Sequence, residues 1–130
     1  MNHHILVFED EIDTRFLMIE ELSQDFVVLD AASGADFETL AQHGEPVAVV
    51  TDMHMGAGRN GADVLELTRR LWPCAARVVV SGSEGARDLL AVGVADVFVR
   101  KPWTWGGLLP SVRSAIRAAA EERETAGNAV

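Results

Sequence analysis

The sequence predicts an α/β fold in which five parallel strands form an open, flavodoxin-like sheet with helices on both faces. Five short apolar or β-branched segments recur along the chain, most of them continuously apolar, and segments with helical periodicity separate them. Continuously apolar strands are typical of a parallel sheet that is buried on both faces. A (βα)5 alternation requires right-handed crossovers, and we expect the strand order 2-1-3-4-5.

The expected strands are HILVF, FVVLD, VAVVT, RVVVS and DVFVR, at residues 4–8, 26–30, 47–51, 77–81 and 96–100. After the first strand, an apolar stripe at three-to-four spacing predicts a helix: Ile12, Phe16, Ile19 and Leu22. A second helix is predicted by Val64, Leu65, Thr68 and Leu71. It ends at Trp72-Pro73, because proline cannot continue a helix.

Two more helices are predicted in the second half of the chain. A short helix with Leu89, Leu90 and Val92 ends at Gly93, a candidate left-handed cap. The last helix carries a further apolar set: Leu108, Leu109, Val112, Ile116 and Ala119. Gly106, Gly107 and Pro110 predict that this helix starts late or bends near the proline. We divide the chain into a domain at 1–118 and a charged tail or linker start at 119–130.

Composition restricts the classes of function. A chain of 130 residues and 14.1 kDa is one domain by length. No apolar run approaches the roughly 20 residues of a membrane span, and the N-terminus lacks signal-peptide features. We therefore expect a cytoplasmic protein without a membrane partner. The net charge of -9 disfavours direct nucleic acid binding, Cys74 has no internal disulfide partner, and we expect a monomer or weak homodimer.

Polar residues stand where the predicted strands end. Glu9 and Asp10 follow the first strand, Asp52 follows the third, Ser81 ends the fourth and Lys101 follows the fifth. Ligands of open α/β sheets bind at the carboxyl ends of the strands, so these side chains should meet in one crevice. Clustered carboxylates require a cation, and an incomplete set of oxygen ligands suits Mg²⁺, with Mn²⁺ as a substitute. Asp52 is then the natural nucleophile for phosphoryl transfer, assisted by Lys101 and Ser81.

Four fragments in this order resemble a response regulator receiver domain of the CheY-like superfamily: FEDE, TDMHM, VVVSG and VRKPW, at residues 8–11, 51–55, 78–82 and 99–103. The resemblance covers about residues 4–118. It implies that Asp52 accepts a phosphoryl group from a phosphohistidine on a sensor histidine kinase or histidine phosphotransfer protein. It also implies that Mg²⁺ is held by Asp10, by Glu9 through water, by Asp52 and by the backbone carbonyl of His54.

The resemblance further implies a conformational switch in a two-component system or phosphorelay. Ser81 would move toward the phosphoryl group and Phe98 would change rotamer. The surface of the fourth helix, fifth strand and fifth helix would then change for an output domain or partner that the sequence does not identify. Such a domain is not an enzyme in the usual sense, because it catalyses only its own phosphorylation and dephosphorylation. A cis Lys101-Pro102 bond is also implied.

Two features depart from the family pattern. Gly56 stands where the family usually has proline, and the loop MGAGRNG at 55–61 is about one residue longer than is common. This predicts a looser loop after the third strand. The spacing from Ser81 to Lys101 is short, which predicts a truncated fourth helix.

Four other interpretations stay open on the residues alone. A degenerate receiver would act only as a docking module. A haloacid-dehalogenase-like phosphatase also uses an aspartyl nucleophile, but it needs a second acid two residues later, where this chain has His54. A flavodoxin-like cofactor binder would need a phosphate loop where EDE stands at 9–11. The histidines at positions 3, 4 and 54 suggest Zn²⁺ only weakly, because no His/Cys set has structural-zinc spacing.

Overall fold

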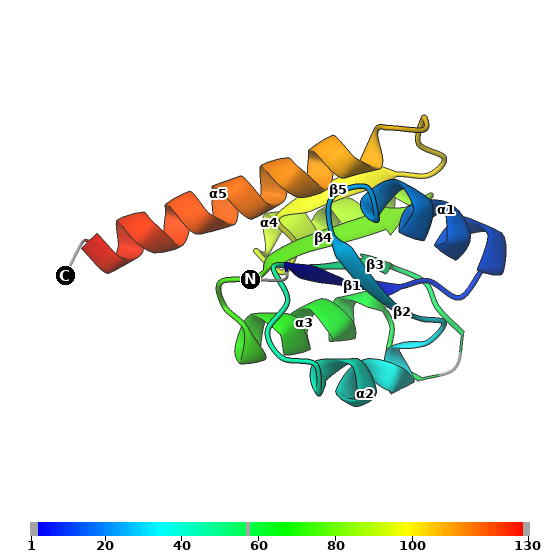
Figure 1. Cartoon of the computed structure of the whole chain (residues 1–130), viewed down its shortest axis with the longest axis horizontal. Helices are drawn as coiled ribbons and strands as arrows, with labels where there is room; N and C mark the ends of the chain where they lie inside the picture. The colour runs from blue at the N-terminus through cyan, green and yellow to red at the C-terminus, as the bar shows by residue number, and fades with distance from the viewer. Residues whose placement is uncertain (1–2, 57, 129–130) are drawn as a thin grey trace.

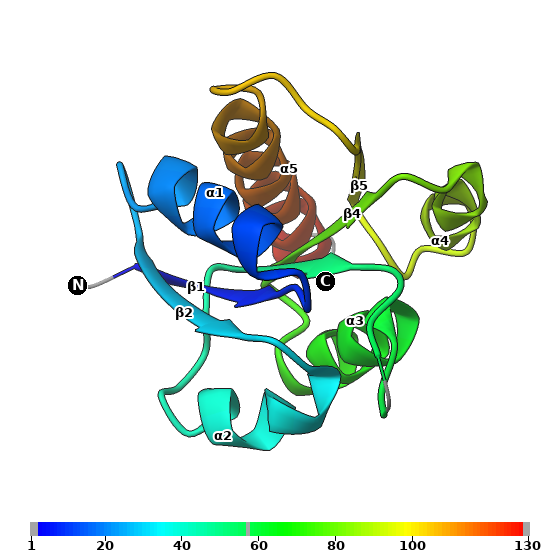
Figure 2. The same cartoon turned by 90° about the vertical axis from the view of Figure 1, so that its right-hand side faces the viewer.

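The computed structural model describes residues 3–56 and 58–128, with side chains described as far as residue 122. Five parallel strands form one sheet in the order β2-β1-β3-β4-β5 (Figures 1 and 2). The strands are β1 (His4–Phe8), β2 (Val27–Ala31), β3 (Ala48–Asp52), β4 (Ala76–Ser81) and β5 (Val97–Arg100). The predicted fold class and strand order are confirmed.

Helices cover both faces of the sheet. The helices α1 (Ile12–Leu22) and α5 (Leu108–Asn128) lie on one face, as Figure 2 shows. The other face carries α2 (Phe37–Ala41), α3 (Gly61–Leu71) and α4 (Asp88–Ala91), with the 3-10 turns η1 (Gly34–Asp36) and η2 (Glu84–Arg87). In the described part of the chain, no helix combines the length and the apolar character that crossing a membrane requires.

The sheet separates two apolar cores. Successive side chains of a strand point to opposite faces, so Ile5 and Val7 pack with α1 and α5, whereas Leu6 and Phe8 pack with α2 and α3. All of β3 and β4 is buried. The three central strands, β1, β3 and β4, are therefore fixed from both sides, and so are the positions at which they end.

The apolar stripe predicted for the first helix is wrong at its N-terminal end. Ile12 and Phe16 are 69% and 59% exposed. The buried residues are Met18, Glu21 and Leu22, which form a three-to-four set of their own on another side of α1. The apolar pattern allowed either of two helix faces to be buried, and packing against α5 and β2 buries the face that carries Glu21.

The other helices agree more closely with their predicted limits. In α3, Val64, Leu65 and Thr68 are buried, but Leu71 is 56% exposed because it is the last helical residue. The helix α4 has only four residues, so the truncation is confirmed, and Gly93 has the expected positive φ of 78°.

The helix α5 starts late, at Leu108. Pro110 therefore lies in its first turn, where a missing N–H is tolerated. The predicted apolar set of α5 faces the core, with Ile116 only partly buried. The helix continues to Asn128, past the predicted boundary at residue 118. That division of the chain stays a prediction.

Candidate phosphoacceptor site

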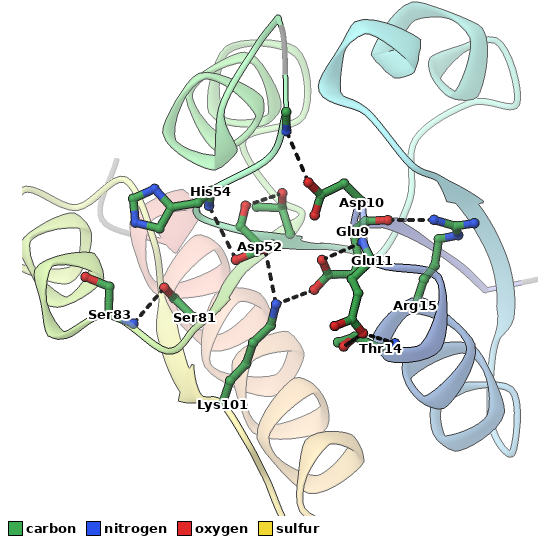
Figure 3. A network of polar contacts seen from close by, with 12 residues as sticks. Glu9, Asp10, Glu11, Thr14, Arg15, Asp52, His54, Ser81, Ser83 and Lys101 are labelled. Carbon is green, nitrogen blue, oxygen red and sulfur yellow. Dashed lines mark hydrogen bonds and ion pairs between the residues drawn. The ribbon is translucent and has the colours of Figure 1, made fainter.

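Three acids meet at the carboxyl edge of the sheet (Figure 3). Glu9 and Asp10 follow β1, and Asp52 is the last residue of the neighbouring strand β3. One carboxylate oxygen from each of them lies within 4.8 Å of the others. Glu9 and Asp52 are buried, whereas Asp10 is exposed. The parallel register of β1 and β3 thus brings together residues that are more than 40 positions apart, as the sequence predicts.

Lys101 joins this cluster from the other side. It follows β5, and its backbone N–H donates to the carbonyl of Ser81 at 3.0 Å. Its ammonium forms an ion pair with Glu9 and lies 3.1 Å from Oδ2 of Asp52. The bond between Lys101 and Pro102 is cis, as the resemblance to receiver domains implied. Lys101 is also the only lysine in the sequence.

The charges of the cluster perturb one another. Burial raises the pKa of Glu9, the hydrogen bond from Lys101 lowers it and the negative charge of Asp52 raises it, and the net pKa is about 7. Burial by itself would lower the pKa of Lys101, but the hydrogen bond to Glu9 and the charges of both acids raise it above its usual range. One ammonium therefore pairs with the two buried carboxyl groups, and together with Asp10 the cluster retains an excess of negative charge that attracts cations.

The loop after β3 is tied to the acids through its backbone. The N–H of His54 donates to Oδ1 of Asp52 at 3.3 Å, and the N–H of Gly56 donates to Oδ2 of Asp10 at 3.2 Å. The side chain of His54 is exposed. A proline at position 56 could not donate this second bond. Further along, Arg59 pairs with Glu38 at 2.6 Å.

The chain is similar to known proteins in sequence and in fold. No protein-family model matches the sequence. The chain is 33% identical over 129 residues to the hydrogenase transcriptional regulatory protein HoxA of Bradyrhizobium diazoefficiens, covering 95% of this chain but 26% of HoxA. It thus spans about a quarter of the length of that relative. The structure of the response regulator TrrA from Thermotoga maritima, in complex with Mg²⁺-BeF, is 25% identical with a TM-score of 0.76, covering 87% of this chain and 98% of TrrA.

A CheY-like receiver domain from Methanospirillum hungatei has a TM-score of 0.82 at 18% identity, with 94% of this chain and 99% of that chain covered. The chain is a CheY-like receiver domain. Receiver domains belong to two-component signalling regulators and are signalling domains rather than classical enzymes.

The two predicted switch residues of the receiver domain lie on adjacent strands. Ser81 ends β4 and is buried, and its Oγ accepts a hydrogen bond of 3.1 Å from the N–H of Ser83. Phe98 is half-buried on β5, with the Arg87 guanidinium 4.9 Å from the centre of its ring. Glu84 pairs with Arg87 at 2.6 Å and also with Arg100. The start of the α4 region is therefore linked to the outer face of β5.

Sequence reasoning missed several residues that shape the receiver site. Arg15 donates to the carbonyl of Glu9 at 2.8 Å and pairs with Asp30 at 3.2 Å, so it fixes the backbone of the acidic segment. Glu21 is fully buried under the segment that follows Lys101. No local motif marks either residue, because both act on partners in another element.

A pocket of about 440 Å³ opens beside the site, between α1 and the connection from β5 to α5. Its lining is mostly apolar: Thr14, Leu17, Lys101, Pro102, Trp103 and Trp105. Leu17 is 47% exposed and Trp105 is 57% exposed. Trp105 is thus largely exposed, whereas Trp103 packs against the core.

Proposed function

We propose that this receiver domain accepts a phosphoryl group on Asp52 from a phosphohistidine of a sensor histidine kinase or histidine phosphotransfer protein, in a Mg²⁺-dependent reaction. The observation that carries the proposal is the position of the Lys101 ammonium, 3.1 Å from the Asp52 carboxylate and within a group of three acids. A solvated carboxylate at a strand end would need neither the buried neighbour Glu9 nor an ammonium from another strand.

The acids fit a hard divalent cation. Two carboxylates 4.8 Å apart repel by about 3 kcal/mol at an effective dielectric constant near 20. All donors are oxygens, which is the preference of Mg²⁺ and of Mn²⁺ as its substitute. Glu9, Asp10 and Asp52 would hold the ion, together with the backbone carbonyl of His54. When bound, the ion supplies positive charge to the oxygens of the transferred phosphoryl group.

The side chains of this domain have distinct tasks in the transfer. A carboxylate oxygen of Asp52 forms a bond to phosphorus while the bond from phosphorus to the donor imidazole nitrogen breaks. The leaving imidazole keeps the electron pair and takes a proton from solvent. Lys101 neutralises charge on the transferred group, and the Ser81 hydroxyl donates to one of its oxygens. Attack of water on phosphorus later releases phosphate and restores the Asp52 carboxylate.

We assign the docking of the donor protein to the surface beside the site. The pocket between Leu17 and Trp105 has Lys101 in its lining, so it borders the cluster on the lysine side. Exposed apolar residues on a charged domain mark protein contacts. Ile12 and Phe16 extend the apolar surface along α1. A helical donor can cover these residues while its phosphohistidine reaches Asp52.

Phosphorylation would switch the face formed by α4, β5 and α5. It adds roughly -1.5 to -2 of charge at Asp52, which attracts the Ser81 hydroxyl. The bond from Ser83 to Ser81 then has to change, and Phe98 gains room to turn inward. Because Arg87 contacts both Glu84 and Phe98, rotation of Phe98 would also change these contacts. An output domain or partner protein would read the altered face.

The test is direct phosphorylation. The protein is incubated with Mg²⁺ and acetyl phosphate, and intact-mass spectrometry measures the adduct. One acid- and base-labile phosphoryl group per chain is expected, absent in Asp52→Asn and absent after chelation of the metal. No adduct on the wild type, or an adduct that survives Asp52→Asn, would count against the proposal.

Two alternatives give different results in the same experiment. A degenerate receiver that serves only as a docking module would show neither the adduct nor measurable Mg²⁺ affinity. A phosphatase would turn over phosphate esters, but the position two residues after Asp52 is His54 rather than an acid, and its side chain is exposed. We therefore expect no such turnover.

A further inference from the structure

Glu21 is a buried acid that the phosphotransfer chemistry does not use. It lies on α1 and is 0% exposed. Its carboxylate accepts hydrogen bonds from the indole N–H of Trp103 at 3.1 Å, from the backbone N–H of Gly106 at 3.0 Å and from the backbone N–H of Leu109. Among the residues that the structure describes, no lysine or arginine forms an ion pair with it. A buried carboxylate is tolerated without a cation only when such donors satisfy it.

The three donors span the whole connection between β5 and α5. Trp103 lies two residues after Lys101, Gly106 has a positive φ of 89° in the turn, and Leu109 is in the first turn of α5. The first N–H groups of a helix lack partners within the helix. Glu21 supplies an acceptor for one of them from a different helix, and α1 and α5 lie side by side (Figure 2). One carboxylate thus fastens both ends of the connection to α1.

Lys101 is the site residue that directly precedes the part of the β5–α5 connection held by Glu21. On the strand side, its backbone N–H is bound to Ser81. On the other side, the chain is anchored within two residues, because Glu21 and the core hold Trp103. The ammonium must span from this backbone position to Asp52 and Glu9. A misplacement of about 1 Å at a catalytic group can reduce a rate about 10²-fold.

We propose that Glu21 is a positioning residue of the phosphoacceptor site: it fixes the β5–α5 connection on α1 and thereby sets the position of Lys101 relative to Asp52. This inference rests on the proposed function, because the position of Lys101 matters for phosphoryl transfer. The effect of Glu21 on the position of Lys101 does not itself depend on any phosphodonor. A purely structural role would stabilise the fold and leave the environment of Lys101 in the folded protein unchanged.

The single lysine allows a selective measurement. An amine-reactive ester labels only Lys101 and the N-terminal amine, and mass spectrometry gives the ratio of the two rates. Glu21→Gln keeps the size of the side chain but loses the charge and one acceptor oxygen. We expect the Lys101 ratio to rise about fivefold or more, as local opening becomes easier. Trp103→Phe keeps an aromatic side chain of smaller size but removes the indole N–H, and the ratio should rise in the same direction by a smaller factor.

Thr68→Val is the matched control. It removes a buried hydrogen bond of 2.8 Å, from Thr68 to the carbonyl of Val64 in α3, away from α1 and the connection. The ratio for this variant should stay within about twofold of the wild type. Thermal unfolding shows that each protein is folded at the labelling temperature. If Glu21→Gln does not fold, Trp103→Phe decides. An unchanged ratio in the folded variants, or an equal rise in Thr68→Val, overturns the proposal.

Phosphorylation by acetyl phosphate supplies the functional readout. Glu21→Gln should lower the maximal rate about tenfold or more and leave the donor concentration for half-maximal rate unchanged, because the donor contacts are intact. An unchanged maximal rate in a variant with faster Lys101 labelling overturns the link to catalysis. If the wild type itself is not phosphorylated, the proposed function fails, and the labelling ratio still decides whether Glu21 positions Lys101.

Discussion

Replacing Glu9 with glutamine should remove a pH-dependent loss of stability from the metal-free protein. Burial raises the pKa of Glu9 from its ordinary value of 4.5 to about 7. Between these pH values the folded protein keeps a proton on Glu9 that the unfolded chain has released. The stability associated with this proton is fully present below pH 4.5 and is lost as the pH rises through 7.

The magnitude follows from the difference between the two pKa values. At roughly 1.36 kcal/mol per pH unit, Glu9 lowers the free energy of unfolding by up to about 3 kcal/mol between about pH 5 and pH 8. Mg²⁺ bound as proposed would act in the opposite direction, because a cation at the three carboxylates favours ionised Glu9. Saturating Mg²⁺ should therefore flatten the pH dependence of stability.

Urea denaturation at several pH values, with and without Mg²⁺, measures the effect. The difference in unfolding free energy between the wild type and Glu9→Gln cancels the titration of groups that both proteins share. Glu45→Gln, a neutralisation at an exposed position, should keep the wild-type slope. A difference between wild type and Glu9→Gln that is constant across the range, or that grows in favour of the wild type with pH, refutes the reasoning.

Substitutions at three further positions test single contacts. Lys101→Gln should slow phosphorylation by acetyl phosphate about 10²-fold in a mass-spectrometric time course, since a fixed positive donor is lost. In calorimetric titrations, Gly56→Pro should weaken Mg²⁺ binding, because Asp10 loses its hydrogen bond from the N–H of residue 56. Gly56→Ala is the control, since it keeps the N–H and has open space for its Cβ. Equal Mg²⁺ affinities of the two variants would contradict this. Asp96→Ala should lower the unfolding free energy by about 3 kcal/mol in urea, because buried Arg77 loses this carboxylate.

The site was predictable from sequence to the extent that strand ends determine it. In a parallel sheet every strand ends at the same edge, so recognising β1, β3 and β5 is enough to bring Asp10, Asp52 and Lys101 together. The apolar runs marked these strands to within one residue at either end. The order of the strands, with β1 beside β3, then places the acids within 4.8 Å.

Features that depend on the choice between helix faces were not predictable. Both the stripe through Ile12 and Phe16 and the set of Met18, Glu21 and Leu22 have helical spacing. Apolarity favours the first set, and the structure buries the second. The buried face is selected by N–H donors more than 80 residues away in the sequence, because they satisfy the carboxylate of Glu21 in the interior. Local periodicity contains no information about such a partner.

In the part of the chain that the structure describes, two acids are fully buried, Glu9 and Glu21, and they are compensated in different ways. Glu9 is balanced by Lys101, whose long side chain is flexible, and the proposed divalent cation would take over that balancing role. Its environment is therefore adapted to a change of charge at Asp52. Glu21 is balanced by an indole N–H and two backbone N–H groups, which have fixed directions and no charge. An acid of this second kind cannot exchange its partners without moving backbone, so it resists rearrangement. The receiver site thus combines a responsive acid next to the proposed phosphoacceptor Asp52 with a rigid one behind Lys101, and only the first should respond to metal.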